Sequence, residues 1–403
     1  MYKKIISGVT AMALMTSTIV TAAPAATQQP LVSGSIISRV RALLDNPATW
    51  DKIPEKVTLC VFAPGGQNSK GFQYAISRIS ELPKYTELAK DIGIDLNVTM
   101  TSSTSMRINF GYPKLKRKAS TDVKFNIYTD ERVASEDFKS NQCDGIAMSN
   151  LRARQYNSFV GSLDAIGAVQ SYKQLSEVIN LLARPEMGKY MVNDDFETVG
   201  IIPMGAAYIM VNDRKINTIA KAAGRKVAVF DFDKSQAIMV QKIGAQPVAV
   251  DFATIGGKFN NGQVDIMAAP ALVFEPLELY RGMTDATGNA RGAIIKFPLL
   301  QVTGVLMMHR GKFPDGMGQL VREFSATQLA PAYQFILETE SEVPSKFWVD
   351  VPEADKPGYT AMMRSARIEI TKDGLYDKRM MSLLKKTRCK LEPSNYECAL
   401  TDE

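Results

Sequence analysis

Short apolar runs alternate with amphipathic stretches along most of the chain. Runs of four to nine residues bounded by turn residues predict strands, and stretches with apolar residues every three or four positions predict helices. The predicted strands are KVTLCVFAP (56–64), IDLNVTM (94–100), VKFNIYT (123–129), CDGIAMS (143–149), AAYIMVN (206–212), KVAVF (226–230), PVAV (247–250) and VDIMAAP (264–270). Helices are predicted over 70–90, 130–140, 171–191, 215–224, 233–244, 251–262, 315–338 and 375–386.

Strands that alternate with helices predict parallel sheets covered by helices, the α/β class. The chain of 403 residues is long enough for two domains. We predict that residues 26–204 form a first lobe, to which 293–330 return. Residues 205–292 then form a second lobe, on which the C-terminal helices of 331–403 pack.

The first 25 residues have the pattern of a cleaved secretory signal. Lys3 and Lys4 precede a largely apolar run from Ile5 to Val20, and small residues follow up to Ala25. A membrane anchor is the weaker alternative, because the run is short and contains Ser7 and Gly8. No later segment approaches the roughly 18 uninterrupted apolar residues that a spanning helix needs. We therefore expect an exported, soluble protein.

Charge and cysteine content narrow the function classes. The net charge is only +6, and the one dense basic run, KLKRK at 114–118, lies in a polar stretch that predicts an exposed loop rather than a nucleic-acid site. Four cysteines in an exported chain suggest two disulfides. Cys389 and Cys398 flank a Pro-Ser-Asn turn, which leaves Cys60 and Cys143 as the second pair, although four cysteines allow three connectivities.

Metal or histidine-based catalysis has little support in the sequence. The cysteine spacing does not fit a zinc site, and His309 is the single histidine. It lies in the apolar run LMMHR, where a structural role is expected. We predict no metal and no cofactor.

Two α/β lobes predict a cleft at the carboxyl ends of their strands, where helix N-termini and loop amides converge. The residues that follow the predicted strands are therefore candidates for ligand binding. They are Gly65, Gly66, Gln67, Ser149, Asn150, Arg152, Phe230, Asp231, Ala269 and Pro270.

The stretch KVAVFDFDKS (226–235) raises the question of catalysis. An apolar strand followed by D-x-D-x-S resembles the first motif of haloacid-dehalogenase-type phosphatases. Such a site needs Mg²⁺ and further acids at the end of a neighbouring strand. The neighbouring run ends instead in Ala-Ala-Pro. The alternative is that Asp233 caps the following helix, which leaves Asp231 as a possible ligand contact.

The order of segments from 211 to 270 resembles the solute-binding proteins of tripartite ATP-independent periplasmic (TRAP) transporters. The matching elements are Gly224-Arg225-Lys226, Gly244-Ala245-Gln246-Pro247-Val248 and Gly262-Gln263-Val264-Asp265. The resemblance implies a two-lobed periplasmic binding protein type II fold, each lobe a doubly wound, mainly parallel sheet with a hinge between them. It also implies a monomer in the periplasm of a Gram-negative bacterium, which captures a small-molecule solute and delivers it to integral-membrane transporter subunits.

One difference between this sequence and the TRAP family affects which solute we expect. The family carries an arginine two residues after the strand's lysine, which binds the solute's carboxylate bidentately. Lys226 is here followed by Val227 and Ala228. Arg152 and Arg154 are alternative anion-binding residues, although a solvated helix face is the expectation for both. If neither arginine binds the solute, Asp231 and Asp233 suit a cationic or polyhydroxylated solute.

Two other functions remain open at this point. One is a magnesium-dependent phosphatase that uses Asp231 and Asp233. The other is a periplasmic accessory protein of an export or efflux system, which keeps the binding-protein fold but has lost its solute. The absence of a convincing catalytic set favours a binding protein over an enzyme.

Overall fold

The computed structural model describes residues 34–80, 86–193 and 195–403. The signal peptide predicted over 1–25 lies outside these residues. Within residues 31–403 the chain forms one compact unit by its internal contacts.

The described strands join in one ladder of eleven, in the order β2-β3-β4-β1-β5-β10-β6-β9-β7-β8, with β11 paired to β10. In chain order they are β1 (Lys56–Phe62), β2 (Asp95–Ser102), β3 (Ser105–Tyr112), β4 (Arg117–Tyr128), β5 (Gly145–Ser149), β6 (Phe196–Val211), β7 (Lys226–Phe230), β8 (Gln246–Val250), β9 (Ile266–Ala269), β10 (Ala293–His309) and β11 (Trp348–Val349).

Two parallel cores lie within this ladder. In the first half of the chain, β1 pairs in parallel with β4 and β5. In the second half, β7 pairs in parallel with β8 and β9. The predicted α/β class is confirmed, and each core brings the carboxyl ends of its strands to one edge.

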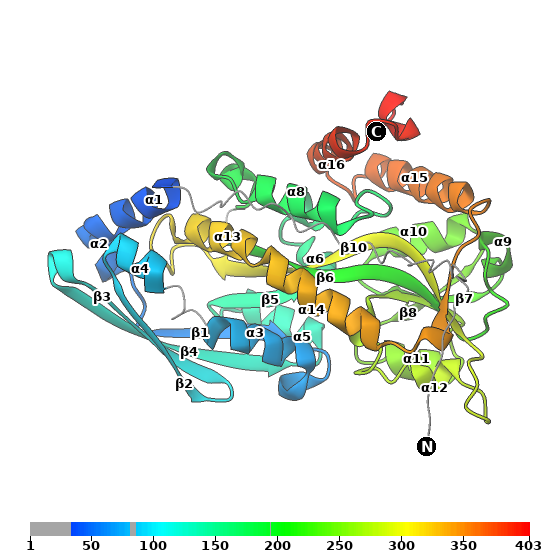
Figure 1. Ribbon diagram of the computed structural model, residues 1–403, viewed down its shortest axis with the longest axis horizontal. Helices are drawn as coiled ribbons and strands as arrows, with labels where there is room; N and C mark the ends of the chain where they lie inside the picture. The colour runs from blue at the N-terminus through cyan, green and yellow to red at the C-terminus, as the bar shows by residue number, and fades with distance from the viewer. Residues whose placement is uncertain (1–33, 81–85, 194) are drawn as a thin grey trace, which may run out of the picture. The chain divides into compact units, whose positions relative to one another are not determined.

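The two longest strands, β6 and β10, connect the two cores. They pair antiparallel along their length; the C-terminal part of β10 also pairs with β5, and the C-terminal part of β6 pairs with β9. Their register is irregular on both sides of Pro298, which pairs with Tyr208. On β6, Gly205, which pairs with Val302, has a φ of +106°, which L side chains rarely adopt. Figure 1 shows both strands passing through the centre of the described fold.

The start of the sheet differs from the prediction. We expected 56–64 and 94–100 to form a parallel β-α-β unit, but β2 pairs with β3 only, and antiparallel, while β3 pairs antiparallel with β4. Only two residues separate β2 from β3, and so short a connection allows only an antiparallel neighbour. The basic run 114–118 lies at the turn between β3 and β4 and is exposed, as predicted.

Each stretch predicted to be helical contains a described helix, and further helices lie outside those stretches. They are α1 (Gly34–Asp45), α2 (Pro47–Asp51), α3 (Lys70–Ser80), α4 (Thr86–Ile92), α5 (Glu131–Lys139), α6 (Asn150–Ala153), α7 (Ser158–Gly161), α8 (Tyr172–Leu182), α9 (Ile219–Ala222), α10 (Lys234–Lys242), α11 (Ile255–Asn260), α12 (Tyr280–Met283), α13 (Met317–Thr327), α14 (Leu329–Glu342), α15 (Lys356–Lys372) and α16 (Lys378–Leu391). No helix was predicted at α1, α2, α6, α7, α12 or α15. In α15, Pro357-Gly358 follows Lys356 and is typical of a turn, although proline is also favoured in the first turn of a helix.

The C-terminal helices lie on the same side of β6 and β10 as α8 (Figure 1). Helix α15 contacts α10, whereas α16 contacts α7 and α8. The C-terminal segment therefore contacts elements from both halves of the chain. The division into two lobes at residue 205 stays a prediction.

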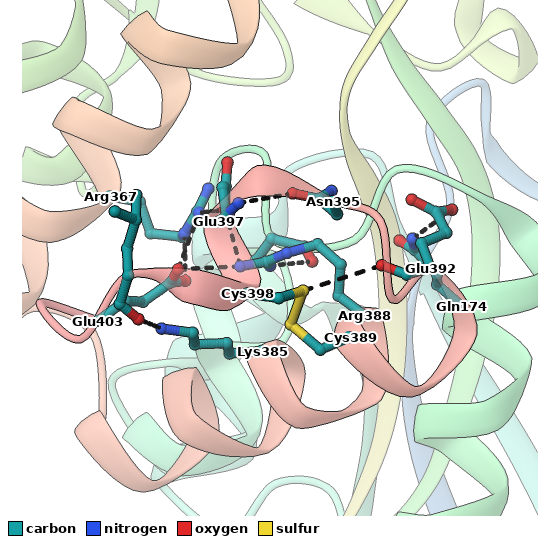
Figure 2. Close-up of a disulfide and its surroundings, with 12 residues drawn as sticks. Gln174, Arg367, Lys385, Arg388, Cys389, Glu392, Asn395, Glu397, Cys398 and Glu403 are labelled. Atoms are coloured by element: carbon teal, nitrogen blue, oxygen red, sulfur yellow. Dashed lines mark hydrogen bonds and ion pairs between the residues drawn. A yellow bond between two sulfur atoms is a disulfide. The ribbon is translucent and has the colours of Figure 1, made fainter.

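Both predicted disulfides are confirmed. Cys60 on β1 is bonded to Cys143, just before β5, and Cys389 on α16 is bonded to Cys398. Figure 2 shows the second disulfide beside a cluster of buried charges. These are Arg367, Arg388, Glu397 and Glu403, which form ion pairs with one another.

The charge cluster also holds a loop of the first half. Arg367 Nη1 donates to the carbonyl of Ile166 at 2.9 Å, and Arg388 Nη1 donates to that of Ala168 at 3.0 Å. Arg367 is fully buried, and so its charge depends on Glu397 and Glu403 for compensation. The C-terminal segment thereby fixes the position of Ile166.

Candidate functional site

A cavity of about 70 Å³ lies between the end of α6, strand β7, helix α10 and the segment that joins α15 to α16. Most of its wall is apolar, including Ile166 and Ala228. Ala228 occupies the position at which the TRAP resemblance predicts an arginine. The polar groups in the wall include Arg154, Asp233 and Asp164.

Asp233 is the N-cap of α10, as the sequence predicts. Its carboxylate accepts from the backbone N–H of Ser235 at 3.0 Å and from the Ser235 hydroxyl. Asp233 is 5% exposed. Burial of a carboxylate requires a cationic partner as well as hydrogen bonds.

Arg154 is that partner. Its Nη1 lies 3.0 Å from Asp233 Oδ1, its Nε donates to the carbonyl of Gly161, and its guanidinium lies over the ring of Tyr376. The expectation of a solvated helix face for Arg154 is therefore wrong. Helix α6 has only four residues, so Arg154 at its end points into the fold, toward α10 and the α15–α16 segment.

The Arg154–Asp233 pair is incompletely satisfied. Arg154 Nη2 and Asp233 Oδ2 are both buried, and neither has a hydrogen-bond partner. A buried polar atom without a partner costs roughly 1–3 kcal/mol. The pair thus keeps one unpartnered donor and one unpartnered acceptor beside the cavity, and both atoms are buried within the fold.

Asp164 adds a second carboxyl to the cavity wall. Its oxygens accept from Asn150 Nδ2 at 3.1 Å and from the backbone N–H and hydroxyl of Thr303. Burial raises the pKa of Asp164 to about 6, against the lowering effect of these hydrogen bonds. The sequence analysis missed this residue; its only signal was a single acid in the apolar run SLDAIGAV.

Arg152 is also buried, contrary to the expectation of a solvated face. Its Nε lies 3.1 Å from Glu131 Oε2, and its guanidinium stacks on the ring of Phe232 at 3.8 Å. Burial raises the pKa of Glu131 to about 7, although hydrogen bonds from Ser149 and the charge of Arg152 lower it. Arg152 thus joins the first half of the chain to the segment after β7.

The remaining candidates from the first half have structural contacts. Ser149 caps α6 through its side chain, and Asn150 is fully buried, where it donates to the carbonyl of Val160. Gly65 and Gln67 are exposed and Gly66 is half-buried. None of these five residues lines the cavity.

Of the four candidates from the second half, one lines the cavity and the other three do not. Phe230 lines the cavity, whereas Asp231 is exposed and its backbone N–H pairs with the carbonyl of Val250. Ala269 and Pro270 follow Ala268, which is part of the wall. The structure thus brings Phe230 to the cavity and places Asp231 outside it.

An aromatic cluster that the sequence analysis missed lies beside the pair formed by Arg152 and Phe232. Phe62, at the end of β1, contacts Phe252, which follows β8, with ring centroids 4.8 Å apart. Phe252 in turn lies 4.2 Å from Phe230. These rings join the carboxyl ends of the two parallel cores.

Within the described ranges, no group of three or more His, Cys, Asp or Glu side chains is placed to hold a metal ion. His309 is buried and its Nε2 lies 2.8 Å from the carbonyl oxygen of Phe138, which is the structural role predicted for it. Among the helices described, none is long and apolar enough to span a membrane.

Comparison with known proteins identifies the family. A family model described as "Solute-binding protein AdeT 1/2" matches residues 13–403. The chain belongs to this family. It is 46% identical over 282 residues to "Probable solute-binding protein AdeT1" of Acinetobacter baumannii, covering 70% of this chain and 91% of that protein. It is 28% identical over 242 residues to "Probable solute-binding protein AdeT2" of the same organism, covering 60% of this chain and all of that protein.

Solved structures similar to this AdeT 1/2 family member are TRAP periplasmic solute-binding proteins. One from Haemophilus influenzae with bound L-gulonate gives a TM-score of 0.60 at 11% identity, covering 82% of this chain and 99% of that one. One from Desulfovibrio salexigens with bound orotic acid gives 0.58 at 13% identity, covering 84% and 100%. DctP7 of Bordetella pertussis, which binds pyroglutamic acid, gives 0.59 at 11% identity, covering 83% and 100%.

These comparisons confirm two predictions. Structural similarity at such low identity establishes the fold, which is the two-lobed type II fold of periplasmic binding proteins. The family assignment confirms that the protein is a solute-binding protein.

Proposed function

We propose that this protein is a periplasmic receptor that captures a small-molecule solute between its two lobes and delivers it to a membrane transporter. The observation that carries the proposal is the cavity that Arg154 and Asp233 line. These residues come from different halves of the chain, and each has a buried polar atom with no partner. A solute in this cavity would contact residues of both halves and so stabilise the contact between them.

The arrangement favours binding without turnover. Asp233, which a phosphatase would use as general acid, is occupied as a helix cap and as the partner of Arg154. Asp231, the corresponding nucleophile, is exposed and lies outside the cavity. We propose a receptor that acts as a monomer and needs no cofactor.

Expression of the full chain in a Gram-negative host tests location and chemistry together. We expect the protein in the periplasmic fraction, with an intact mass that lacks about the first 25 residues. Solutes incubated with the purified protein, with and without Mg²⁺, should be recovered unchanged by mass spectrometry. Retention of the full N-terminus in the cytoplasm, or conversion of a phosphoester that Asp231→Asn abolishes, would contradict the proposal.

A further inference from the structure

A second cavity narrows the class of solute, an inference that rests on the proposed function. This cavity has a volume of about 60 Å³ and lies between strands β6, β7, β9 and β10 and helices α9, α10 and α15. We infer that the first and second cavities together bind a small uncharged solute with an apolar ring or chain.

The two cavities adjoin each other. Five residues belong to both walls, namely Val227, Met239, Val240, Ala268 and Leu299. Met239 on α10 has a flexible, unbranched side chain, which can change its conformation at little cost. Ala268 is exposed although β9 is paired with β6 and with β7, so its face of the sheet is left partly uncovered by side chains. A solute can therefore extend from one cavity into the other when Met239 moves.

The wall of the second cavity is almost entirely apolar. Among the described residues, no Lys, Arg, Asp or Glu lines it, and its polar side chains are Thr218 and Tyr359. The hydroxyl of Thr218 already accepts from the backbone N–H of Lys221 as the cap of α9. A charged or polyhydroxylated group would lose its hydration there without gaining enough partners, which is unfavourable. An apolar group leaves water and gains contacts.

The charged groups of the first cavity do not require a charged solute. The charge of Arg154 is compensated by Asp233. The oxygens of Asp164 accept hydrogen bonds from two neighbouring side chains. Ala228 stands where an arginine would bind a carboxylate, and the other wall residues of the first cavity are mostly apolar. The two cavities therefore favour apolar surface over charge.

The volumes set the size of the solute. One water needs about 10–15 Å³ of such space, so that each cavity holds roughly four to seven water-sized groups. A molecule of roughly seven to ten non-hydrogen atoms would fill the greater part of both. A single aromatic ring with a short substituent has this size.

Calorimetric titration with matched compounds tests the inference. The uncharged compounds are toluene and n-pentanol. Benzoate and pentanoate carry a negative charge on a similar body, and benzylamine and pentylamine carry a positive one. We expect toluene or n-pentanol to bind one molecule per chain, and its charged counterparts to bind at least tenfold more weakly.

Methyl NMR of isotope-labelled methionines locates the bound compound in the unaltered protein. Met239 and Met362 line the second cavity, whereas Met380 and Met381 are buried in neither wall. Toluene should shift the methyl signals of Met239 and Met362 and leave those of Met380 and Met381 in place.

Two alanines of α9 supply a matched pair of variants. Ala222 is buried and lines the second cavity, so that Ala222→Leu would fill part of the space and should weaken toluene binding at least tenfold. Ala220 on the same helix is exposed and lines neither cavity, and Ala220→Leu should leave binding unchanged. Circular dichroism and thermal unfolding verify the fold of both variants. If Ala222→Leu does not fold, the methionine signals of the unaltered protein still decide the site.

The outcomes separate this inference from the proposed function. If neither toluene nor n-pentanol binds, or if a charged counterpart binds as tightly, the apolar assignment is overturned. Binding that leaves the signals of Met239 and Met362 unshifted, or that Ala220→Leu and Ala222→Leu weaken equally, would overturn it as well. Binding of a sugar acid or polyol in place of the apolar compounds would leave the receptor proposal standing, whereas no binding of any solute tested would remove both.

Discussion

At the scale of single residues, the Arg154–Asp233 pair links stability to binding. Such a pair is costly to break by removing one partner, because an uncompensated charge stays buried. The pair nevertheless keeps one unpaired atom on each side. Arg154 and Asp233 are therefore held in place by contacts within the fold, in the wall of the cavity.

Asp164 gives a pH dependence that can be measured. Its pKa is raised from 3.8 to about 6 in the folded protein, so the folded state binds a proton more tightly than the unfolded state. Its contribution to stability is therefore complete below about pH 4 and is lost as the pH rises through about 6. At about 1.4 kcal/mol per pKa unit, we expect the loss to be on the order of 2–3 kcal/mol.

Urea unfolding at several pH values between 4 and 8 tests this expectation. The free energy of unfolding of Asp164→Asn should fall less between pH 4 and pH 7 than that of the unaltered protein. Asp231→Asn, which removes an exposed acid, serves as the control. Parallel curves for the unaltered protein and Asp164→Asn would show that Asp164 does not titrate in this range.

At the scale of elements, the approach of α7 to the end of α6 positions Arg154. A Cβ atom on Gly161 would lie 2.4 Å from Arg154 Cα, a distance that real structures do not tolerate. We expect Gly161→Ala to destabilise the protein by about 2–3 kcal/mol, as overpacking does elsewhere, and to weaken solute binding. Gly257→Ala is the matched control, since its Cβ meets nothing within 4 Å in α11, and it should be neutral or stabilising. Denaturant midpoints compare the two, and equal stability would show that α6 and α7 can separate freely.

The disulfide between Cys60 and Cys143 ties the central strand of the first parallel core to the start of its neighbour. It closes a loop with a sequence separation of 83 residues, and both cysteines are buried. Replacing both with alanine should lower the free energy of unfolding by about 2–5 kcal/mol. Guanidinium unfolding measures the loss, and a change below about 1 kcal/mol would show that packing alone holds β1 to β5.

The features that the sequence predicts correctly are those that depend on residues close together in the chain. The strand 226–230, the cap at Asp233 and the helix ends at Gly224 and Gly244 depend on residues within a few positions of one another, and all are present. Arg154 could not be placed, because its partners lie some 80 and 220 positions away, at Asp233 and Tyr376. The antiparallel β2–β3 hairpin was missed because its polar residues obscured the strand signal.

At the scale of the whole molecule, β6 and β10 are the elements that would accommodate movement of the two halves. Their register shifts near Pro298 and the positive φ of Gly205 lie in the part of the ladder between the two parallel cores. Side-chain contacts join the carboxyl ends of the two parallel cores, such as those of Arg152 with Phe232 and Arg154 with Asp233. Such contacts can open and close without unfolding either core.

Thermal unfolding of the mature protein against a panel of solutes tests solute capture most directly. The panel contains carboxylates, sugar acids, amines, polyols, amino acids and uncharged apolar compounds. A solute at 100 times its dissociation constant adds about 2.7 kcal/mol to stability, which raises the melting temperature by a few degrees in a protein of this size. We predict such a shift for one chemical class of solute, and no shift when the same solutes are added to the Arg154→Gln variant. A flat panel, with protein that native mass spectrometry shows to be free of ligand, would contradict solute capture by this protein.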